Sequence, residues 1–166
     1  RGSFTGTDTV AISVTAVNDA PANTVPGAQT TAEDTNKVIT GLSVADPDAT
    51  GSLTVTLAVT NGTLSLLTGT GVTLAGNNST SVTLTGTVNA INALLATTNA
   101  VTYKPTPNFS GSSTLTMTSS DGTLSDTNAL LLGADADNRL YFKPATGVAS
   151  GSVFCSVQRA PAAASE

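Results

Sequence analysis

The chain has 166 residues and a net charge of −5, and only 10% of its residues are charged and 4% aromatic. This weakly acidic composition lacks the basic stripe expected of a nucleic-acid-binding protein, and it is too apolar for outright disorder. The chain has no histidine, which excludes Ser-His-Asp and Cys-His centres and His-ligated zinc. Its single cysteine, Cys155, cannot form an intrachain disulfide. The longest apolar run, residues 129–132 with their flanks, is too short to insert into a membrane.

Threonine and valine dominate the chain, and β-branched residues favour strands. Residues 9–17 carry apolar side chains at every second position, which predicts a half-buried strand. Residues 18–21 (NDAP) end that strand, because proline donates no hydrogen bond to a ladder. A weaker edge segment is expected over residues 24–31 and a full strand over residues 37–44.

Further strands are predicted at residues 51–60, 63–67, 72–74 and 81–87, and Asn61-Gly62 favours a hairpin after the first of them. The apolar spacing then changes to that of a helix. Val88, Ile91, Leu94 and Leu95 predict a helix of two to three turns with Thr87 as its N-cap.

The last predicted strands cover residues 100–104, 114–118 and 129–132. Short strands separated by turn residues every eight to twelve positions, with few aromatics to thicken a core, indicate two facing sheets. We therefore predict an all-β fold, a β-sandwich or barrel with one short helix packed on it.

An internal repeat divides the chain. Residues 8–19 align without a gap with residues 126–137, which implies a unit of about 118 residues. The expected organisation has five parts: residues 1–17 as the last strand of a preceding repeat, with residues 1–3 resembling a cloning remnant; residues 18–23 as a linker; residues 24–134 as the sandwich; residues 135–159 as a truncated further repeat; and residues 160–166 as a disordered tail.

Acidic residues recur where the predicted strands end. In a sandwich, the linker, the loop after the second strand and the loop near the end of the penultimate strand meet at one pole. Asp19, Asp46, Asp48 and Asp121 would then lie close together and repel one another unless a cation lay among them. Ca²⁺ takes about six to eight oxygen ligands, and the linker backbone or the side chain of Asn18 offers more. Each motif alone is more often a solvated turn, so the metal hypothesis depends on their joint occurrence.

Four of these motifs resemble those of cadherins. Residues 18–21 (NDAP) resemble the linker motif, residues 32–34 (AED) the acidic motif near the first strand, residues 46–48 (DPD) the Asp-x-Asp motif and residues 121–125 (DGTLS) the motif of the penultimate loop. Residues 17–126 are similar to the tandem cadherin-like repeats of large bacterial surface adhesins of the RTX type. This resemblance implies that the fold is an Ig-like or cadherin-like β-sandwich with one short helix.

The resemblance implies a set of calcium ligands. Asn18, Asp19, Asp46, Asp48 and Asp121 would share Ca²⁺ at one pole. Glu33 and Asp34 would lie at the opposite pole and serve the next junction together with Asp135 and Asp137. That second junction departs from the pattern, because residues 135–138 (DADN) have lost the NDAP ending.

The expected function is that of a structural repeat in a secreted or cell-surface adhesin, stiffened by Ca²⁺, with neighbouring repeats of the same polypeptide as its partners and no enzymatic activity. The alternative is a carbohydrate- or ice-binding module that uses an exposed threonine face. Three sets of threonines have the spacing of one strand face, namely Thr54 and Thr56, Thr83 and Thr85, and Thr114, Thr116 and Thr118. An unpaired strand at residues 9–17 also invites homotypic strand exchange.

Overall fold

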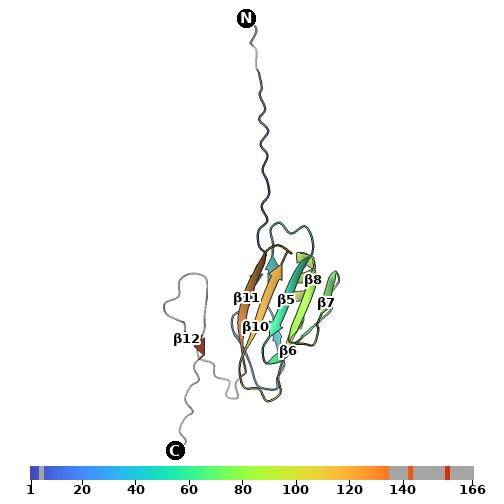
Figure 1. Ribbon diagram of the computed structural model, residues 1–166, viewed down its shortest axis with the longest axis vertical. Helices are drawn as coiled ribbons and strands as arrows, with labels where there is room; N and C mark the ends of the chain where they lie inside the picture. The colour runs from blue at the N-terminus through green and yellow to red at the C-terminus, as the bar shows by residue number, and fades with distance from the viewer. Residues whose placement is uncertain (4–5, 135–141, 144–155, 158–166) are drawn as a thin grey trace, which may run out of the picture.

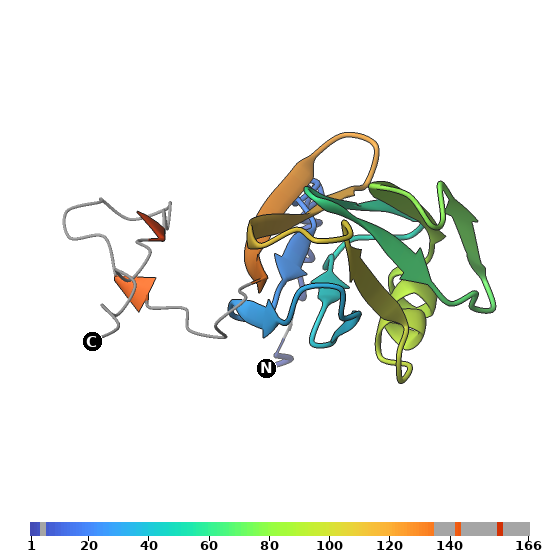
Figure 2. The same ribbon diagram turned by 90° about the horizontal axis from the view of Figure 1, so that it is seen from below.

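The computed structural model describes residues 1–3, 6–134, 142–143 and 156–157. It confirms an all-β sandwich. A six-stranded sheet faces a layer of shorter strands, and one helix closes the side of the sandwich (Figures 1 and 2). The strands are β1 (Ala22–Thr24), β2 (Gln29–Thr31), β3 (Lys37–Ile39), β4 (Ser43–Ala45), β5 (Leu53–Val59), β6 (Gly62–Leu66), β7 (Val72–Ala75), β8 (Ser81–Gly86), β9 (Val101–Pro105), β10 (Gly111–Ser120), β11 (Ser125–Ala134), β12 (Phe142–Lys143) and β13 (Ser156–Val157), and the helix is α1 (Val88–Leu95).

The larger sheet has the strand order β2-β11-β10-β5-β8-β7, and the facing layer consists of β3-β9-β6 and the pair β1-β4. Burial alternates along the central strands, so that every second side chain points into the sandwich. Leu57, Leu84, Leu115 and Met117 are fully buried between the layers. The core is aliphatic, and among the residues that the structure describes Tyr103 is the one aromatic side chain in it.

Helix α1 forms as predicted. The hydroxyl of Thr87 accepts a hydrogen bond from the Ala90 N–H at 3.2 Å, which satisfies one of the free amides of the first turn. Ile91, Leu94 and Leu95 are buried. Asn92 ties the helix to β4, because its amide group both donates to the Val44 carbonyl at 2.7 Å and accepts from the Val44 N–H at 2.9 Å.

Two local predictions were wrong. Asn61-Gly62 does not close a hairpin, because β5 belongs to the larger sheet and β6 to the facing layer. Asn61 has a φ of 53°, and a Cβ at Gly62 would collide with the Tyr103 ring and the Lys104 carbonyl, so this pair turns the chain from one layer to the other. The strand predicted over residues 37–44 is split by Gly41, with a φ of 81°, into β3 and β4.

The half-buried strand predicted at residues 9–17 was also wrong for this chain on its own. Residues 6–17 form an extended segment with exposed side chains that pairs with no strand among the described residues (Figure 1). The physical reason lies in the sheet: β11 already pairs with β10 along its whole length. Alternation alone cannot supply the missing neighbour.

The predicted truncated repeat and tail fall mostly outside the described residues, and so do Asp135, Asp137 and Cys155. Of that region the structure describes β12 and β13, which pair antiparallel. Of the stretch that aligns with residues 8–19, residues 126–134 lie in β11, and residues 135–137 fall outside the described residues.

Candidate cation site at the linker

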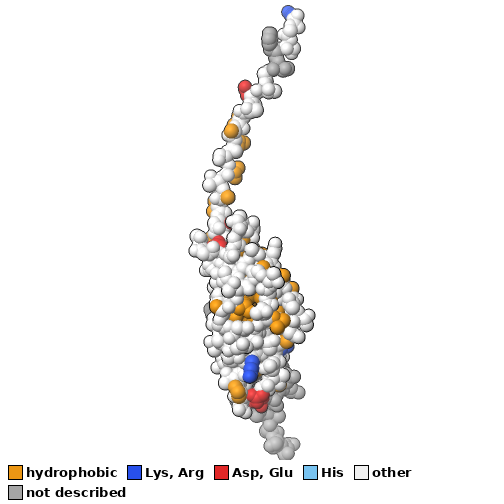
Figure 3. All heavy atoms as spheres, turned by 90° about the vertical axis from the view of Figure 1, so that its right-hand side faces the viewer, with side chains coloured by type: hydrophobic (Ala, Val, Ile, Leu, Met, Phe, Trp, Pro, Cys, Tyr) orange, Lys and Arg blue, Asp and Glu red, His pale blue; other side chains and the backbone are white. Residues whose placement is uncertain are grey.

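The linker enters the sandwich at the pole where two acidic loops lie. Asp46 and Asp48 follow β4, and Asp121 lies in the loop that joins β10 to β11. Because β1 pairs antiparallel with β4, the start of β1 and the end of β4 lie at the same pole. In Figure 3 acidic atoms appear where the extended segment meets the body of the molecule.

Two hydrogen bonds join the linker to these loops. The side-chain amide of Asn18 donates to Asp121 Oδ2 at 2.6 Å. The backbone N–H of Asp19 donates to Asp48 Oδ2 at 2.7 Å. The structure therefore brings Asn18 and Asp19 to both of the predicted loops, which are distant from each other in sequence. Both bonds are exposed to solvent, so each contributes little to stability by itself.

The Asp121 loop is preorganised by its own backbone. Asp121 Oδ1 accepts hydrogen bonds from the Thr123 N–H at 2.6 Å and the Leu124 N–H at 2.7 Å. The Leu124 N–H, the Asn18 amide and the Thr123 N–H together lower the pKa of the Asp121 carboxyl below its usual range. Asp121 is therefore held as a carboxylate, the form that binds a cation.

Asp46 is only partly satisfied. Its Oδ1 accepts a hydrogen bond from the Asp48 N–H at 3.2 Å, whereas its Oδ2 is buried and has no hydrogen-bond partner among the described residues. A hollow of about 350 Å³ lies beside it, lined by Ala49, Thr50, Gly51 and the first residues of α1. A buried carboxylate oxygen without a partner is costly, and it is the kind of atom that a cation satisfies.

The donor set fits Ca²⁺ in its chemistry. Asp46, Asp48 and Asp121 offer carboxylate oxygens, and a turn of the Asn18 amide would present its oxygen in place of its nitrogen. In the part of the chain that the structure describes, no three acidic side chains already surround one point. Binding would therefore draw the loops and linker together by exchanging the hydrogen bonds of Asn18 and Asp19 for bonds to the ion.

The second predicted group lies elsewhere. Asp34 Oδ1 accepts a hydrogen bond from the Asn108 N–H at 2.8 Å, and Glu33 is exposed. Asn108 precedes β10 whereas Asp121 follows it, so a ten-residue strand, about 30 Å long, separates the two groups. Glu33 and Asp34 are therefore not brought to the linker of this chain, which agrees with their predicted place at the opposite pole.

Asn23 is a residue at the linker that sequence reasoning missed. Its backbone N–H donates to Asp126 Oδ2 at 2.8 Å, and its side chain donates to the Asp126 carbonyl at 2.9 Å and the Met117 carbonyl at 3.2 Å. Asn128 donates in return to the Asn23 carbonyl at 3.0 Å. These bonds fix the chain just after the linker onto the larger sheet. The one sequence signal for them was the Asp8–Asp126 match in the repeat.

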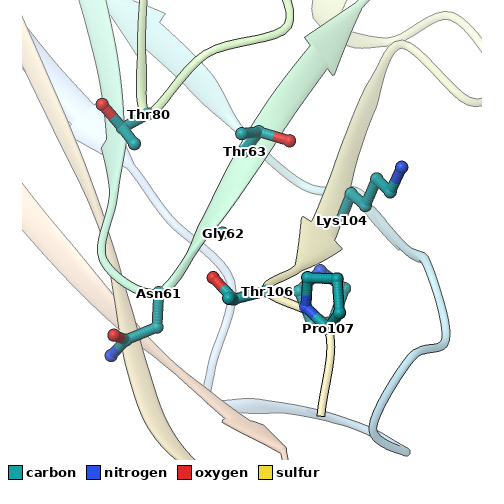
Figure 4. Close-up of a pocket in the computed structure, with 8 residues that line it drawn as sticks. Asn61, Gly62, Thr63, Thr80, Lys104, Thr106 and Pro107 are labelled. Carbon is teal, nitrogen blue, oxygen red and sulfur yellow. The ribbon is translucent and has the colours of Figure 1, made fainter. Parts of the chain in front are cut away.

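A second hollow of about 460 Å³ lies where β5 passes into β6, next to the end of β9 (Figure 4). Asn61, Thr63, Thr80, Thr106 and Pro107 line it, and Lys104 extends away from Asn61 and Thr106. Threonine and proline side chains supply neither a nucleophile with a base nor a set of metal ligands. This hollow does not compete with the linker pole as a functional site.

Comparisons with known proteins gave no match to this chain, whether with family models, curated proteins or solved structures. The resemblance to cadherin-like repeats therefore depends on the sequence motifs alone. No helix among the described residues is long and apolar enough to cross a membrane.

Proposed function

We propose that the chain is a structural repeat of a secreted or cell-surface adhesin, and that Ca²⁺ bound between the linker and the acidic loops holds the preceding segment in a fixed direction. The observation that carries this proposal is the pair of contacts from Asn18 to Asp121 and from Asp19 to Asp48. They join the linker to two loops that are otherwise independent. Asp46, whose Oδ1 accepts from the Asp48 N–H, supports the binding of an ion, because its Oδ2 is buried without a hydrogen-bond partner in the described part of the chain.

The residues divide the work. Asp46 and Asp48 would supply the carboxylates fixed to the sandwich, and the backbone of residues 121–124 holds Asp121 ready for binding. Asn18 and Asp19 belong to the linker, so their attachment decides whether residues 6–17 swing freely. When bound, Ca²⁺ supplies the positive charge that removes repulsion among these carboxylates. The role is mechanical, with neighbouring repeats as partners and no reaction.

Calorimetry with millimolar Ca²⁺ and with chelator tests the proposal. Free ligand at about 100 times its Kd stabilises the folded state by about 2.7 kcal/mol, which raises the Tm of a domain this size by roughly 5–15 °C. The double variant Asp46→Ala with Asp48→Ala should lose the calcium-dependent rise. Glu33→Gln is the matched control at the other pole and should keep it. Equal melting curves of the unaltered chain in Ca²⁺ and in chelator would refute the calcium site.

A threonine surface favours the alternative, a carbohydrate- or ice-binding module. The strand register places Thr127, Thr118, Thr56 and Thr83 in one row across β11, β10, β5 and β8. The Thr118 and Thr127 hydroxyls lie 3.0 Å apart, and those of Thr56 and Thr83 lie 3.3 Å apart. Because sheets twist by about 20–25° from strand to strand, such a row departs from a flat lattice, so we place this function second.

The threonine surface has its own test. A glycan array and an ice-recrystallisation assay should both respond to the unaltered chain if the surface binds, and the response should disappear in the double variant Thr56→Lys with Thr118→Lys. Activity that survives these substitutions would place binding elsewhere on the molecule.

A further inference from the structure

The extended segment exposes large apolar side chains that no other described part of the chain covers. The exposed fractions are 84% for Val10, 83% for Ile12, 87% for Val14 and 80% for Val17. Figure 3 shows the hydrophobic atoms spaced along this segment. Burial of apolar side chains away from water is favourable, so binding of this segment to an apolar surface would be stabilised by each side chain that it covers. Single exposed apolar residues are ordinary, but a regular row of them on an extended strand calls for a partner.

The sequence of the segment identifies the surface that it fits. Residues 8–19 align with residues 126–137, and the aligned pairs are identical at Asp8, Thr9, Ala11, Ala16 and Asp19. In the structure, residues 125–134 form β11, which pairs antiparallel with β10. The segment is therefore a second copy of the strand that occupies the place beside β10.

Burial in β11 agrees with this match at its two buried leucines, although Val10 corresponds to the polar, half-buried Asn128. Ile12 corresponds to Leu130, which is 4% exposed, and Val14 corresponds to Leu132, which is 2% exposed. On the opposite face, Thr9 corresponds to Thr127, whose side chain is exposed. An apolar residue of the segment thus stands at each position where β11 buries leucine.

The start of the segment agrees as well. Asp8 corresponds to Asp126, whose carboxylate accepts a hydrogen bond from the Asn23 N–H at 2.8 Å. An acidic residue at this position fastens the first strand of a sandwich to its last strand. Alternating apolar residues alone do not require an acidic residue there. Asp8 is therefore independent support for a fit of the segment to the position beside β10.

We propose that residues 8–17 are a docking strand, and that their partner is a β-sandwich unit of this same kind whose place beside its β10 is open. The β10–β11 register, applied to the segment, sets Ile12 opposite the Leu115 position of the partner unit and Val14 opposite the Ser113 position. Within one chain the place is taken, because β11 is covalently attached and buries Leu130 and Leu132. This is why the segment stays free, and why the acceptor is an open unit rather than a second chain with its own β11 in place.

A fusion protein tests this directly. Residues 18–125 are joined in front of residues 8–166, so that the added unit has β1 to β10 but must take residues 8–17 as its last strand. Because unfolding enthalpy scales with the number of ordered residues, we expect it to roughly double relative to the 166-residue chain. Calorimetry and limited proteolysis in chelator make the measurement, so the result does not depend on a bound cation.

Two matched variants of the fusion decide the interpretation. Ile12→Asp with Val14→Asp should abolish the added enthalpy, because it places charge on the docking face. Thr9→Asp with Ala11→Asp adds the same charge on the other face and should keep it. The first pair introduced into the 166-residue chain should leave its Tm unchanged, since both side chains are free there. An added unit that stays unfolded in the unaltered fusion, or that folds despite Ile12→Asp with Val14→Asp, would overturn the proposal.

Discussion

Two regions of this molecule have similar strand-like sequences, but they differ in whether they pair in a sheet. β11 is paired on both sides over part of its length, with β10 and with β2, and it buries Leu130 and Leu132. Residues 8–17 align with it, and no strand among the described residues lies beside them. Alternation makes a chain able to form a strand, whereas an open neighbouring ladder decides whether it does. Substitutions in the sandwich and in residues 8–17 should therefore differ in their effect on stability.

The largest expected difference lies between one core residue and its counterpart in the segment. Leu115 is fully buried at the centre of β10, so Leu115→Ala should lower the free energy of unfolding by about 2–5 kcal/mol. Ile12→Ala should change it by less than about 0.5 kcal/mol, because Ile12 is 83% exposed. Urea unfolding followed by circular dichroism gives both values. A comparable loss in Ile12→Ala would mean that the segment packs on the sandwich in solution.

The next prediction concerns how much the attachment of α1 to β4 contributes to the free energy of unfolding. Asn92 makes two hydrogen bonds to the Val44 backbone. Asn92→Ala therefore removes these side-chain partners from the Val44 N–H and carbonyl. We expect a loss of about 1–3 kcal/mol in the free energy of unfolding. Asn89, exposed on the same helix, is the matched control, and Asn89→Ala should have little effect. Equal effects of the two substitutions would show that the Asn92 bonds add no net stability.

A smaller effect is expected at the boundary between the two regions, where Asp121 meets the linker. Its pKa is lower in the folded state than in the unfolded chain, where it is about 3.9. The stabilisation is therefore complete above the unfolded pKa and is lost as the pH falls through the lower, folded pKa. In chelator, the urea midpoint of the unaltered chain should fall more steeply below about pH 4 than that of Asp121→Asn. Parallel curves would show that the Asp121 hydrogen bonds give no net preference for its charged form.

Much of the sandwich could be predicted from the sequence, because its signals are local. Helix α1 follows from the spacing of Val88, Ile91 and Leu95 and from the Thr87 cap. The role of Asn61-Gly62 could not be predicted, since a positive φ suits a hairpin and a crossing between sheets equally well. The sequence of residues 9–17 also could not show whether they pair in a sheet, because pairing depends on whether a neighbouring strand has a free edge.

The candidate site was predictable in part for the same reason. The joint occurrence of Asp46, Asp48 and Asp121 at strand ends predicted that they share a pole with the linker, and the contacts of Asn18 and Asp19 follow that arrangement. For Asn23 the one sequence signal was indirect, namely the match of Asp8 with Asp126 in the repeat. Its four hydrogen bonds link residues about a hundred positions apart, and an asparagine in a three-residue strand does not by itself indicate such partners.

The smallest effect on stability belongs to the linker itself, where we expect a change in geometry instead. Asn18→Ala removes one hydrogen bond to Asp121 that is exposed to solvent, so the Tm should barely move. The segment would, however, lose one of its two attachments to the acidic loops. Nitroxide labels at Ser13 and Thr73, in a chain with Cys155→Ser, report this as a broader distance distribution by pulsed electron paramagnetic resonance. Because both labelled positions are exposed, the labels disturb no packing. A distribution as narrow as that of the labelled chain with Asn18 intact would show that Asp19 and Pro21 alone direct the segment. The ordered region would then begin at Asp19 rather than at Asn18.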